Sequence, residues 1–221
     1  MRLLVVNGNT NEGMTRTLDA AARRMVPDGV EVVTYQVRGG PRYIGSRDTY
    51  AEAVPHIVAR FRELTNGHGP WDAGVLACFG EPGLGDVRRA CDFPVVGMAE
   101  SSAHMAVQLC DSFGVVTPGE NWPSMLRAYF DTLGVLPQCA GIEVVRGEIR
   151  TLDEDEGVAI RVSEAIKRLR TWSKPGVVIV GGAALAGVAE HIRTAEPPIL
   201  VDSFRAAVCQ SIALASVSWR S

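Results

Sequence analysis

The sequence predicts an α/β protein made of two pseudo-symmetric, doubly wound parallel-sheet halves, with an active site in the cleft between them. Short apolar runs alternate with amphipathic segments along the 221 residues. The pattern of strand, polar turn and helix then restarts near residue 113. Strands that alternate with helices indicate parallel sheets covered by helices.

Apolar runs and helical periodicity predict the individual elements. In the first half we expect strands at 3–6, 30–33, 74–77 and 94–97, and helices at 14–25 and 50–64. Pro55 should start or kink the second helix. In the second half we expect strands at 113–117, 141–145, 176–180 and 198–201, helices at 125–133 and 158–169, and an apolar helix at the C-terminal end.

One internal comparison favours a true repeat over the ordinary alternation of strands, turns and helices in α/β proteins. Residues 74–97 and 178–201 both read as strand, small-residue turn, helix and strand led by proline. Aligning Pro94 with Pro198 places Cys78 opposite Gly182 without a gap. We expect residues 1–98 plus 205–221 to form the first lobe and 99–204 the second. Ligands of such sheets bind beyond the carboxyl ends of the strands.

Composition and charge exclude several classes of function. The hydrophobic fraction of 47% and charged fraction of 21% are typical of a soluble globular protein. A net charge of −3 argues against a nucleic-acid partner. Neither a signal peptide nor an apolar run of membrane-spanning length is visible, so we expect a cytoplasmic protein without a membrane partner. A homo-oligomer is compatible with this class of enzyme.

Cysteine usage argues against structural bridges and metal sites. The five cysteines are scattered, odd in number and never in a CxxC pair, so neither a disulfide framework nor a zinc site is expected. Cys78 follows a predicted strand and precedes Gly80 and Pro82, which suits a first helical turn. Such a position should lower the thiol pKa and favour a reactive thiolate. A buried structural cysteine is the alternative; the other four look structural, and Cys139 precedes a strand instead of following one.

Polar residues at other strand ends are candidates for substrate binding. Asn7, Asn9 and Thr10 follow the first strand, and Thr117 is the counterpart of Asn7 in the second half. Their amide and hydroxyl groups can orient a carbonyl, although turn and cap formation explains them equally well. Glu100, His104 and His191 are more simply explained as helix-end or surface residues.

Six ordered motifs resemble hydantoin and allantoin racemases of the aspartate/glutamate racemase superfamily over the whole chain. They are Val6–Thr10, Gly39–Ile44, Ala77–Leu84, Pro94–Glu100, Val115–Thr117 and Gly181–Gly187. The resemblance implies two α/β lobes, no metal or organic cofactor, and two cysteines that flank the stereogenic carbon of a small substrate. Cys78 matches the first of these cysteines. The substrate carboxylate or ring carbonyls would be held near Phe79, Gly80, Gly182, Ala183 and Ala184, with help from Asn9, Thr10 and Thr117.

The sequence departs from this family pattern at the second cysteine. Both the motif and the internal repeat place it at Gly182, which has no side-chain proton. Pro118 is a smaller departure, where these racemases tend to carry another threonine. Three interpretations follow: a racemase that uses water or another side chain on the far face, a single-cysteine decarboxylase of malonate-like acids, or a non-catalytic small-molecule binder. We favour the racemase, with Cys78 as the acid/base next to a carbonyl.

Overall fold

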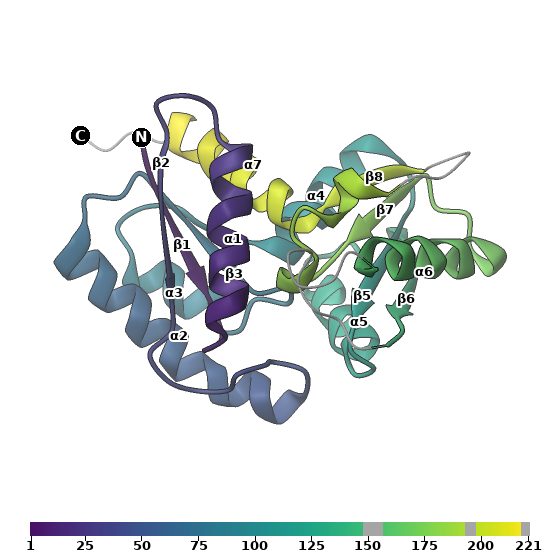
Figure 1. The fold of residues 1–221 in the computed structure, drawn as a ribbon, viewed down its shortest axis with the longest axis horizontal. Helices are drawn as coiled ribbons and strands as arrows, with labels where there is room; N and C mark the ends of the chain where they lie inside the picture. Colours follow the sequence, from purple (N-terminus) through teal and green to yellow (C-terminus); the bar gives the residue numbers. More distant parts are fainter. Residues whose placement is uncertain (148–156, 193–197, 218–221) are drawn as a thin grey trace.

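The computed structural model describes residues 1–147, 157–192 and 198–217, and it contains two four-stranded sheets whose paired strands all run parallel. The strand orders are β2-β1-β3-β4 and β6-β5-β7-β8. Helices flank both sheets, and the two lobes stand side by side (Figure 1). The predicted fold class is confirmed.

The first sheet contains four strands and is followed directly by the helix that leads to the second sheet. Its strands are β1 (Arg2–Asn7), β2 (Glu31–Gln36), β3 (Ala73–Ala77) and β4 (Val95–Gly97). The accompanying helices are α1 (Glu12–Met25), α2 (Arg47–His68), α3 (Leu84–Ala90) and α4 (Met98–Leu109). Strand β3 is buried along its whole length, as expected for a central strand covered on both faces.

The second lobe repeats this plan, and the described residues between its third and fourth strands form 3₁₀ helices instead of an α-helix. Its strands are β5 (Phe113–Pro118), β6 (Cys139–Val145), β7 (Val177–Val180) and β8 (Ile199–Asp202). Its helices are α5 (Trp122–Thr132) and α6 (Val158–Trp172), with short 3₁₀ helices η1 (Leu136–Gln138), η2 (Ala183–Leu185) and η3 (Val188–His191). The final helix of the chain is α7 (Ser203–Val217). The central strands β5 and β7 are fully buried.

Strand register supports the internal alignment residue by residue. Val6 of β1 pairs with Leu76 of β3, and Val116 of β5 pairs with Val180 of β7. Since β1 and β5 hold the same place in their sheets, these pairs are equivalent. Counting two residues beyond Leu76 and Val180 reaches Cys78 and Gly182. The two turns therefore lie at equivalent carboxyl ends.

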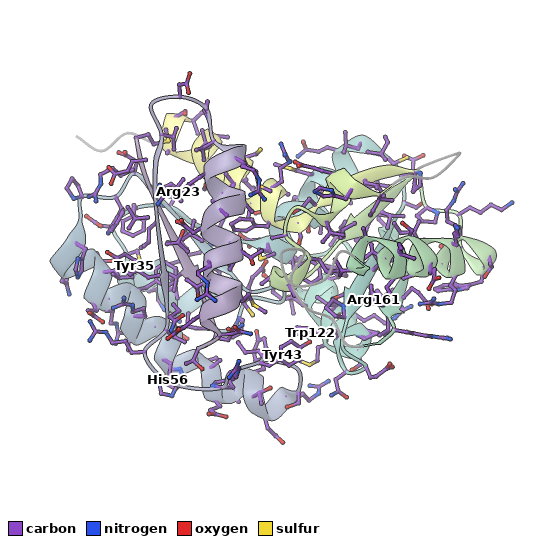
Figure 2. All side chains as sticks on the ribbon, viewed as in Figure 1. Arg23, Tyr35, Tyr43, His56, Trp122 and Arg161 are labelled. Carbon is purple, nitrogen blue, oxygen red and sulfur yellow. The ribbon has the colours of Figure 1, made fainter. Side chains whose placement is uncertain are left out.

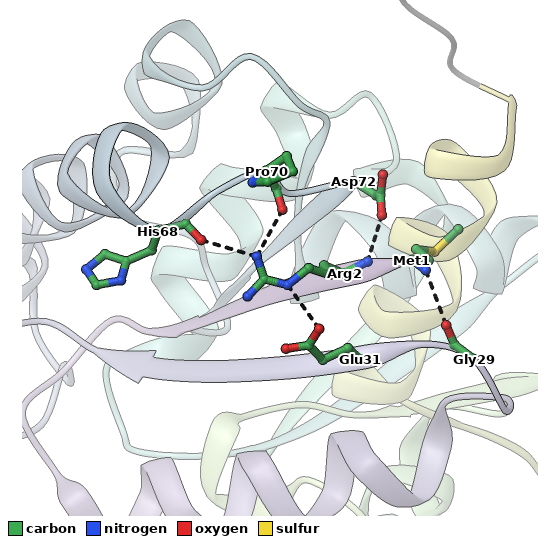
Figure 3. Close-up of polar contacts among 7 residues, drawn as sticks. All are labelled: Met1, Arg2, Gly29, Glu31, His68, Pro70 and Asp72. Atoms are coloured by element: carbon green, nitrogen blue, oxygen red, sulfur yellow. Dashed lines mark hydrogen bonds and ion pairs between the residues drawn. The ribbon is translucent and has the colours of Figure 1, made fainter.

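The opposite end of the first sheet is fixed by Arg2 (Figure 3). Its backbone N–H donates to Asp72 Oδ2 at 2.7 Å, and its guanidinium Nε donates to Glu31 Oε2 at 3.0 Å. A second guanidinium nitrogen donates to the carbonyl oxygens of His68 and Pro70, both at 3.3 Å. These contacts tie β1 to β2 and to the segment before β3. They therefore help to align β3, the strand that leads to Cys78.

Two expected helix starts and one expected helix differ in the structure. Of the two alternatives for Pro55, a helix start is wrong, because α2 begins at Arg47, where Ser46 and Thr49 form a capping box, and contains Pro55 in its interior. Helix α3 begins at Leu84 after a left-handed Gly83, so Pro82 lies in the turn and not in the helix. Within the described part of 178–201, the expected helix is replaced by η2 and η3.

Helix α7 returns from the second lobe to the first. It packs against β3, β4 and α1 as well as against α4 (Figure 1). This packing supports, as a proposal, the division into 1–98 plus 205–221 and 99–204. Across the described ranges we find no helix with the length and apolarity that crossing a membrane requires.

Candidate active site

A small cavity of about 40 Å³ lies where the carboxyl ends of the two sheets meet. Seven of the residues proposed from the sequence line it: Asn9, Cys78, Phe79, Thr117, Gly182, Ala183 and Ala184. The remaining lining residues are Met14, Tyr43, Ile44, Ala77, Pro118 and Trp122. The cavity thus brings together turns from both lobes.

Thr10 and Gly80 were also proposed for this site but are not among the residues that line the cavity. The backbone N–H of Thr10 donates to the carbonyl oxygen of Pro41 at 3.2 Å, which fixes it in the loop beside the cavity. Gly80 lines a second, larger cavity of about 350 Å³. Its carbonyl oxygen accepts a hydrogen bond from the Tyr50 hydroxyl at 3.2 Å.

Cys78 is the first residue after β3, and its turn meets the opposite turn directly. The residue is buried, with 6% of its surface exposed. A Cβ built on Gly181 would lie 2.4 Å from the ring of Phe79, so this ring rests against bare backbone of the second lobe. Cys78 directly precedes Phe79, and Gly182 directly follows Gly181. Both therefore line the same cavity.

The expected low thiol pKa of Cys78 is wrong for this closed cavity. Burial raises the pKa of Cys78 to about 12, and the Glu81 carboxylate adds to the shift. The turn offers little compensation, because α3 is only 7 residues long and begins six positions later, at Leu84. Desolvation of the charged form outweighs the small helix dipole at this distance. In the closed site Cys78 is a neutral thiol.

Glu81 is a feature of this turn that the sequence did not single out. It is 2% exposed and adopts a left-handed backbone with φ of 59°. Its carboxylate Oε1 accepts hydrogen bonds from the backbone N–H groups of Ala99 and, at 3.0 Å, Glu100 at the start of α4. Burial raises the pKa of Glu81 to about 8. The buried carboxyl group ties the Cys78 turn to the next helix.

Gly182 has a backbone that suits glycine alone. Its φ is 130° and its ψ is 140°, a region that residues with a Cβ rarely adopt. A Cβ at this position would lie 3.2 Å from Cδ of Pro118. The first hydrogen bond of η2 runs from Leu185 N–H to Gly182 O, so the N–H groups of Ala183 and Ala184 precede it and can donate to a ligand.

The polar cluster after β1 combines structural and lining roles. Asn7 is fully buried, and its amide Nδ2 donates to Asn9 Oδ1 at 3.1 Å and to Thr15 Oγ1 at 3.0 Å. Asn9 Oδ1 also accepts from the N–H of Asn11, the N-cap of α1. Asn7 therefore orients Asn9, whose amide nitrogen lies 3.2 Å from Met14 Sδ in the cavity wall.

Tyr43 and Trp122 close the cavity and were not proposed as site residues. Tyr43 extends from the loop between β2 and α2, and Trp122 begins α5 in the other lobe; they approach each other between the lobes (Figure 2). A Cβ built on Gly119 would lie 3.1 Å from the Tyr43 hydroxyl oxygen and 3.6 Å from the Trp122 indole nitrogen, so the two polar groups lie near each other. Burial raises the pKa of Tyr43, and the Trp122 indole N–H partly offsets this rise. No helical or strand periodicity marks Tyr43, whereas Trp122 is visible only as a large apolar residue near a helix start.

The remaining cysteines and histidines do not line the cavity. Cys139 is buried at the start of β6, away from the site, as expected from its place before a strand. Cys209 was expected to be structural, but it is exposed on α7. His104 and His191 are also absent from the cavity lining.

The model of the family described as Asp/Glu/Hydantoin racemase matches residues 3–210. The chain belongs to this family. It is 28% identical to a hydantoin racemase from Paenarthrobacter aurescens over 87% of this chain and 81% of the relative. The allantoin racemase structure from Klebsiella pneumoniae is 28% identical with a TM-score of 0.90, covering 98% of this chain and 88% of that chain.

An arylmalonate decarboxylase variant shares the fold at a lower level. It is 10% identical with a TM-score of 0.68, covering 99% of this chain and 94% of that chain. This likeness concerns the fold alone. The hydantoin and allantoin racemase relatives make this Asp/Glu/Hydantoin racemase family member an isomerase of the racemase type.

Proposed function

We propose that the chain is a cofactor-independent cytoplasmic racemase of a small amino acid derivative of the hydantoin, allantoin or amino acid type. Cys78 is its acid/base at the carbon next to a carbonyl. The observation that carries this proposal is the placement of Cys78 in a cavity between equivalent turns of two lobes. The racemase relatives supply the reaction class.

The proposed chemistry uses proton transfer alone. The Cys78 thiolate removes the proton from the substrate carbon, and the C–H electron pair moves into the adjacent carbonyl to give an enolate. Neutral donors near the cavity, among them the N–H groups of Ala183 and Ala184 and the amide of Asn9, hold the carbonyl oxygens. Preorganised donors of this kind stabilise the charge that develops on oxygen.

The reactive thiolate has to form when the cavity is open. A volume of 40 Å³ holds about three water molecules, which is less than a five-membered ring with two carbonyl groups requires. Opening of the cleft admits both substrate and water, and hydration removes the burial that raises the thiol pKa. Closure around the substrate then places the thiolate in a dry site.

Exchange of the Cα–H tests the proposal. Single enantiomers of allantoin, 5-substituted hydantoins and amino acids are incubated with the enzyme in D₂O, and both ¹H NMR and chiral chromatography are followed. Deuterium incorporation with inversion is the expected result. Cys78→Ser should reduce exchange by about 10²–10⁴-fold, the usual contribution of one acid/base group. No exchange with any member of the panel would support a non-catalytic binder instead.

A single-cysteine decarboxylase is the second candidate, since the neutral Cys78 thiol is suited to act as an acid. Cys78 is also the single thiol among the residues that line the cavity. In this reaction the bond to one carboxylate breaks, CO₂ leaves with its C–C electron pair remaining as an enediolate, and the thiol protonates that carbon. CO₂ release from a disubstituted malonate, lost in Cys78→Ser, would favour this function; absence of release argues against it.

A further inference from the structure

The proposed racemase lacks a proton carrier at the position where its family places a second cysteine. Gly182 has no side-chain proton, and its positive φ adapts the turn to glycine. The lining residues with an ionisable side chain are Cys78 and Tyr43. The others offer amide, hydroxyl, indole or apolar groups, whose protons are poorly matched to acid/base exchange at neutral pH.

Tyr43 lines the cavity, and its hydroxyl lies close to the end of β5 in the lobe that contains Gly182. A Cβ built on Gly182 would lie 3.2 Å from Pro118 Cδ. The Tyr43 hydroxyl oxygen lies 3.1 Å from a Cβ built on Gly119, the residue after Pro118. Gly182 and the phenol therefore approach neighbouring residues, Pro118 at the end of β5 and Gly119 directly after it. Cys78 comes from the other lobe, at the end of β3.

We propose, building on the racemase function above, that Tyr43 is the second proton carrier and that it replaces the missing cysteine opposite Cys78. In one direction the Cys78 thiolate takes the substrate proton, and the Tyr43 hydroxyl gives its proton to the other face of the enolate carbon. The products are the opposite enantiomer, a Cys78 thiol and a Tyr43 phenolate. In the reverse direction the phenolate removes the proton and the thiol returns one.

Burial raises the pKa of the Tyr43 hydroxyl above its usual value, and the nearby Trp122 indole N–H offsets only part of this rise. Tyr43 is therefore a neutral phenol that keeps its proton until the enolate carbon takes it. The residue is also 48% exposed at the mouth of the cavity, in contact with solvent that can restore its proton between turnovers. The Gly45 carbonyl oxygen accepts a hydrogen bond from the Asn121 amide at 2.9 Å, which holds the Tyr43 loop against the second lobe.

The test separates exchange from inversion in Tyr43→Phe. This variant keeps the ring that packs at the cavity mouth but removes the proton. In D₂O, with an active enantiomer, we expect inversion to fall by about 10²–10⁴-fold. Exchange with retained configuration should persist, because Cys78 still removes the proton and returns a deuteron to the same face. Tyr35→Phe, on β2 and outside the cavity lining, is the matched control and should behave as the wild type.

Each other outcome overturns the inference in a recognisable way. Inversion at the wild-type rate in Tyr43→Phe shows that another group, such as water, protonates the far face. An equal loss of exchange and inversion shows that Tyr43 positions the substrate or closes the site. Exchange without inversion in the wild type contradicts a role for Tyr43 as second carrier while leaving Cys78 active. No exchange in the wild type contradicts the racemase function itself. A thermal melt of each variant checks that the fold is retained.

Discussion

At the scale of single residues, the site consists of groups whose ordinary chemistry is altered by burial. Cys78 and Glu81 lie in the same turn, and burial raises the pKa of both. The turn itself holds a left-handed non-glycine residue, and such conformations persist only where surrounding contacts enforce them. Three predictions concern these residues and the glycine that faces them.

Cys78 should react slowly with alkylating reagents despite its catalytic role. Its thiol is buried and neutral in the closed site, and the thiolate is the reactive form. Iodoacetamide at pH 8 should therefore modify the exposed Cys209 well before Cys78, as measured by peptide mass spectrometry over time. Cys209→Ser provides the control that assigns the fast site. Preferential labelling of Cys78 would show that the free protein spends much of its time open.

Glu81 should make stability depend on pH. Its pKa rises from 4.5 in the unfolded chain to about 8 in the folded protein, so the folded state binds the extra proton between these values. The free energy of unfolding should therefore fall as pH rises across this window. Urea melts at pH 5 and pH 8 should show this loss in the wild type. Glu81→Gln should reduce it, and an unchanged slope would assign the effect to other groups.

Gly182 should resist substitution because of its backbone. Gly182→Ala places a Cβ at a φ of 130° and should lower the free energy of unfolding by about 1–3 kcal/mol. Gly182→Cys has the same cost, and it increases racemisation only if the chain tolerates the strain. Gly67→Ala is the control, since Gly67 lies in α2 and a Cβ there meets no atom within 4 Å. Denaturant melts compare the three variants, and equal stabilities would contradict the assigned strain.

At the scale of elements, the start of α5 closes the site from the second lobe. Trp122 is the first residue of α5, and its ring lies against two glycines with positive φ, Gly80 and Gly119. A Cβ on Gly80 would lie 2.4 Å from this ring, and one on Gly119 would lie 2.9 Å from it. Trp122 lines both the small cavity at Cys78 and the larger one beside Gly80. The indole is therefore a wall between two spaces.

Removal of this wall should change substrate size preference. Trp122→Ala should join the cavities of about 40 and 350 Å³ and lower stability by about 3–5 kcal/mol, as for other buried aromatic truncations. The ratio of kcat/KM for 5-benzylhydantoin over 5-methylhydantoin should rise relative to the wild type. Trp172→Ala, at an exposed tryptophan that ends α6, serves as the control. An unchanged ratio would show that the larger cavity receives no part of the substrate.

At the scale of the whole molecule, we expect the two lobes to separate when a substrate enters, because the cavity between them is small. The cavity holds about three water molecules as it stands, and contacts across its mouth join the loop before α2 to the start of α5. These are the Tyr43–Trp122 and Gly45–Asn121 contacts. Tyr43 is half exposed and Asn121 is exposed, whereas Trp122 is buried. We expect the rupture of these few contacts to cost less than separation of a buried core.

Hydrogen exchange should detect this opening. Backbone amides of residues 39–45 should exchange quickly in the free enzyme and become protected when a slowly turned-over hydantoin occupies the site. Residues 2–7 of the buried β1 should stay protected in both states and act as the internal control. Deuterium uptake measured by mass spectrometry gives both values. Equal uptake of residues 39–45 with and without ligand would argue against closure of this loop over the substrate.

The fold and half of the site could be predicted because they depend on local signals. All eight strands follow from apolar runs such as 74–77 and 176–180, and the equivalence of Cys78 and Gly182 follows from their spacing. The predicted helix start at Pro55 was wrong, because the capping residue Ser46 starts the helix earlier in the chain. The prediction of a low thiol pKa for Cys78 was wrong because burial outweighs the dipole of one short helix. Burial depends on the packing of the two lobes.

The sequence alone determined the fold class, the repeat and the position of Cys78 at a strand end, because buried strands, polar turns and their order are encoded locally. The tertiary structure decided what faces that thiol. Tyr43 comes from a loop of the first lobe and Trp122 from the start of a helix in the second, so only their meeting at the cavity mouth reveals them. Proton affinity is decided there as well, because the cost of a buried charge depends on the atoms that exclude water, and these come from distant parts of the chain.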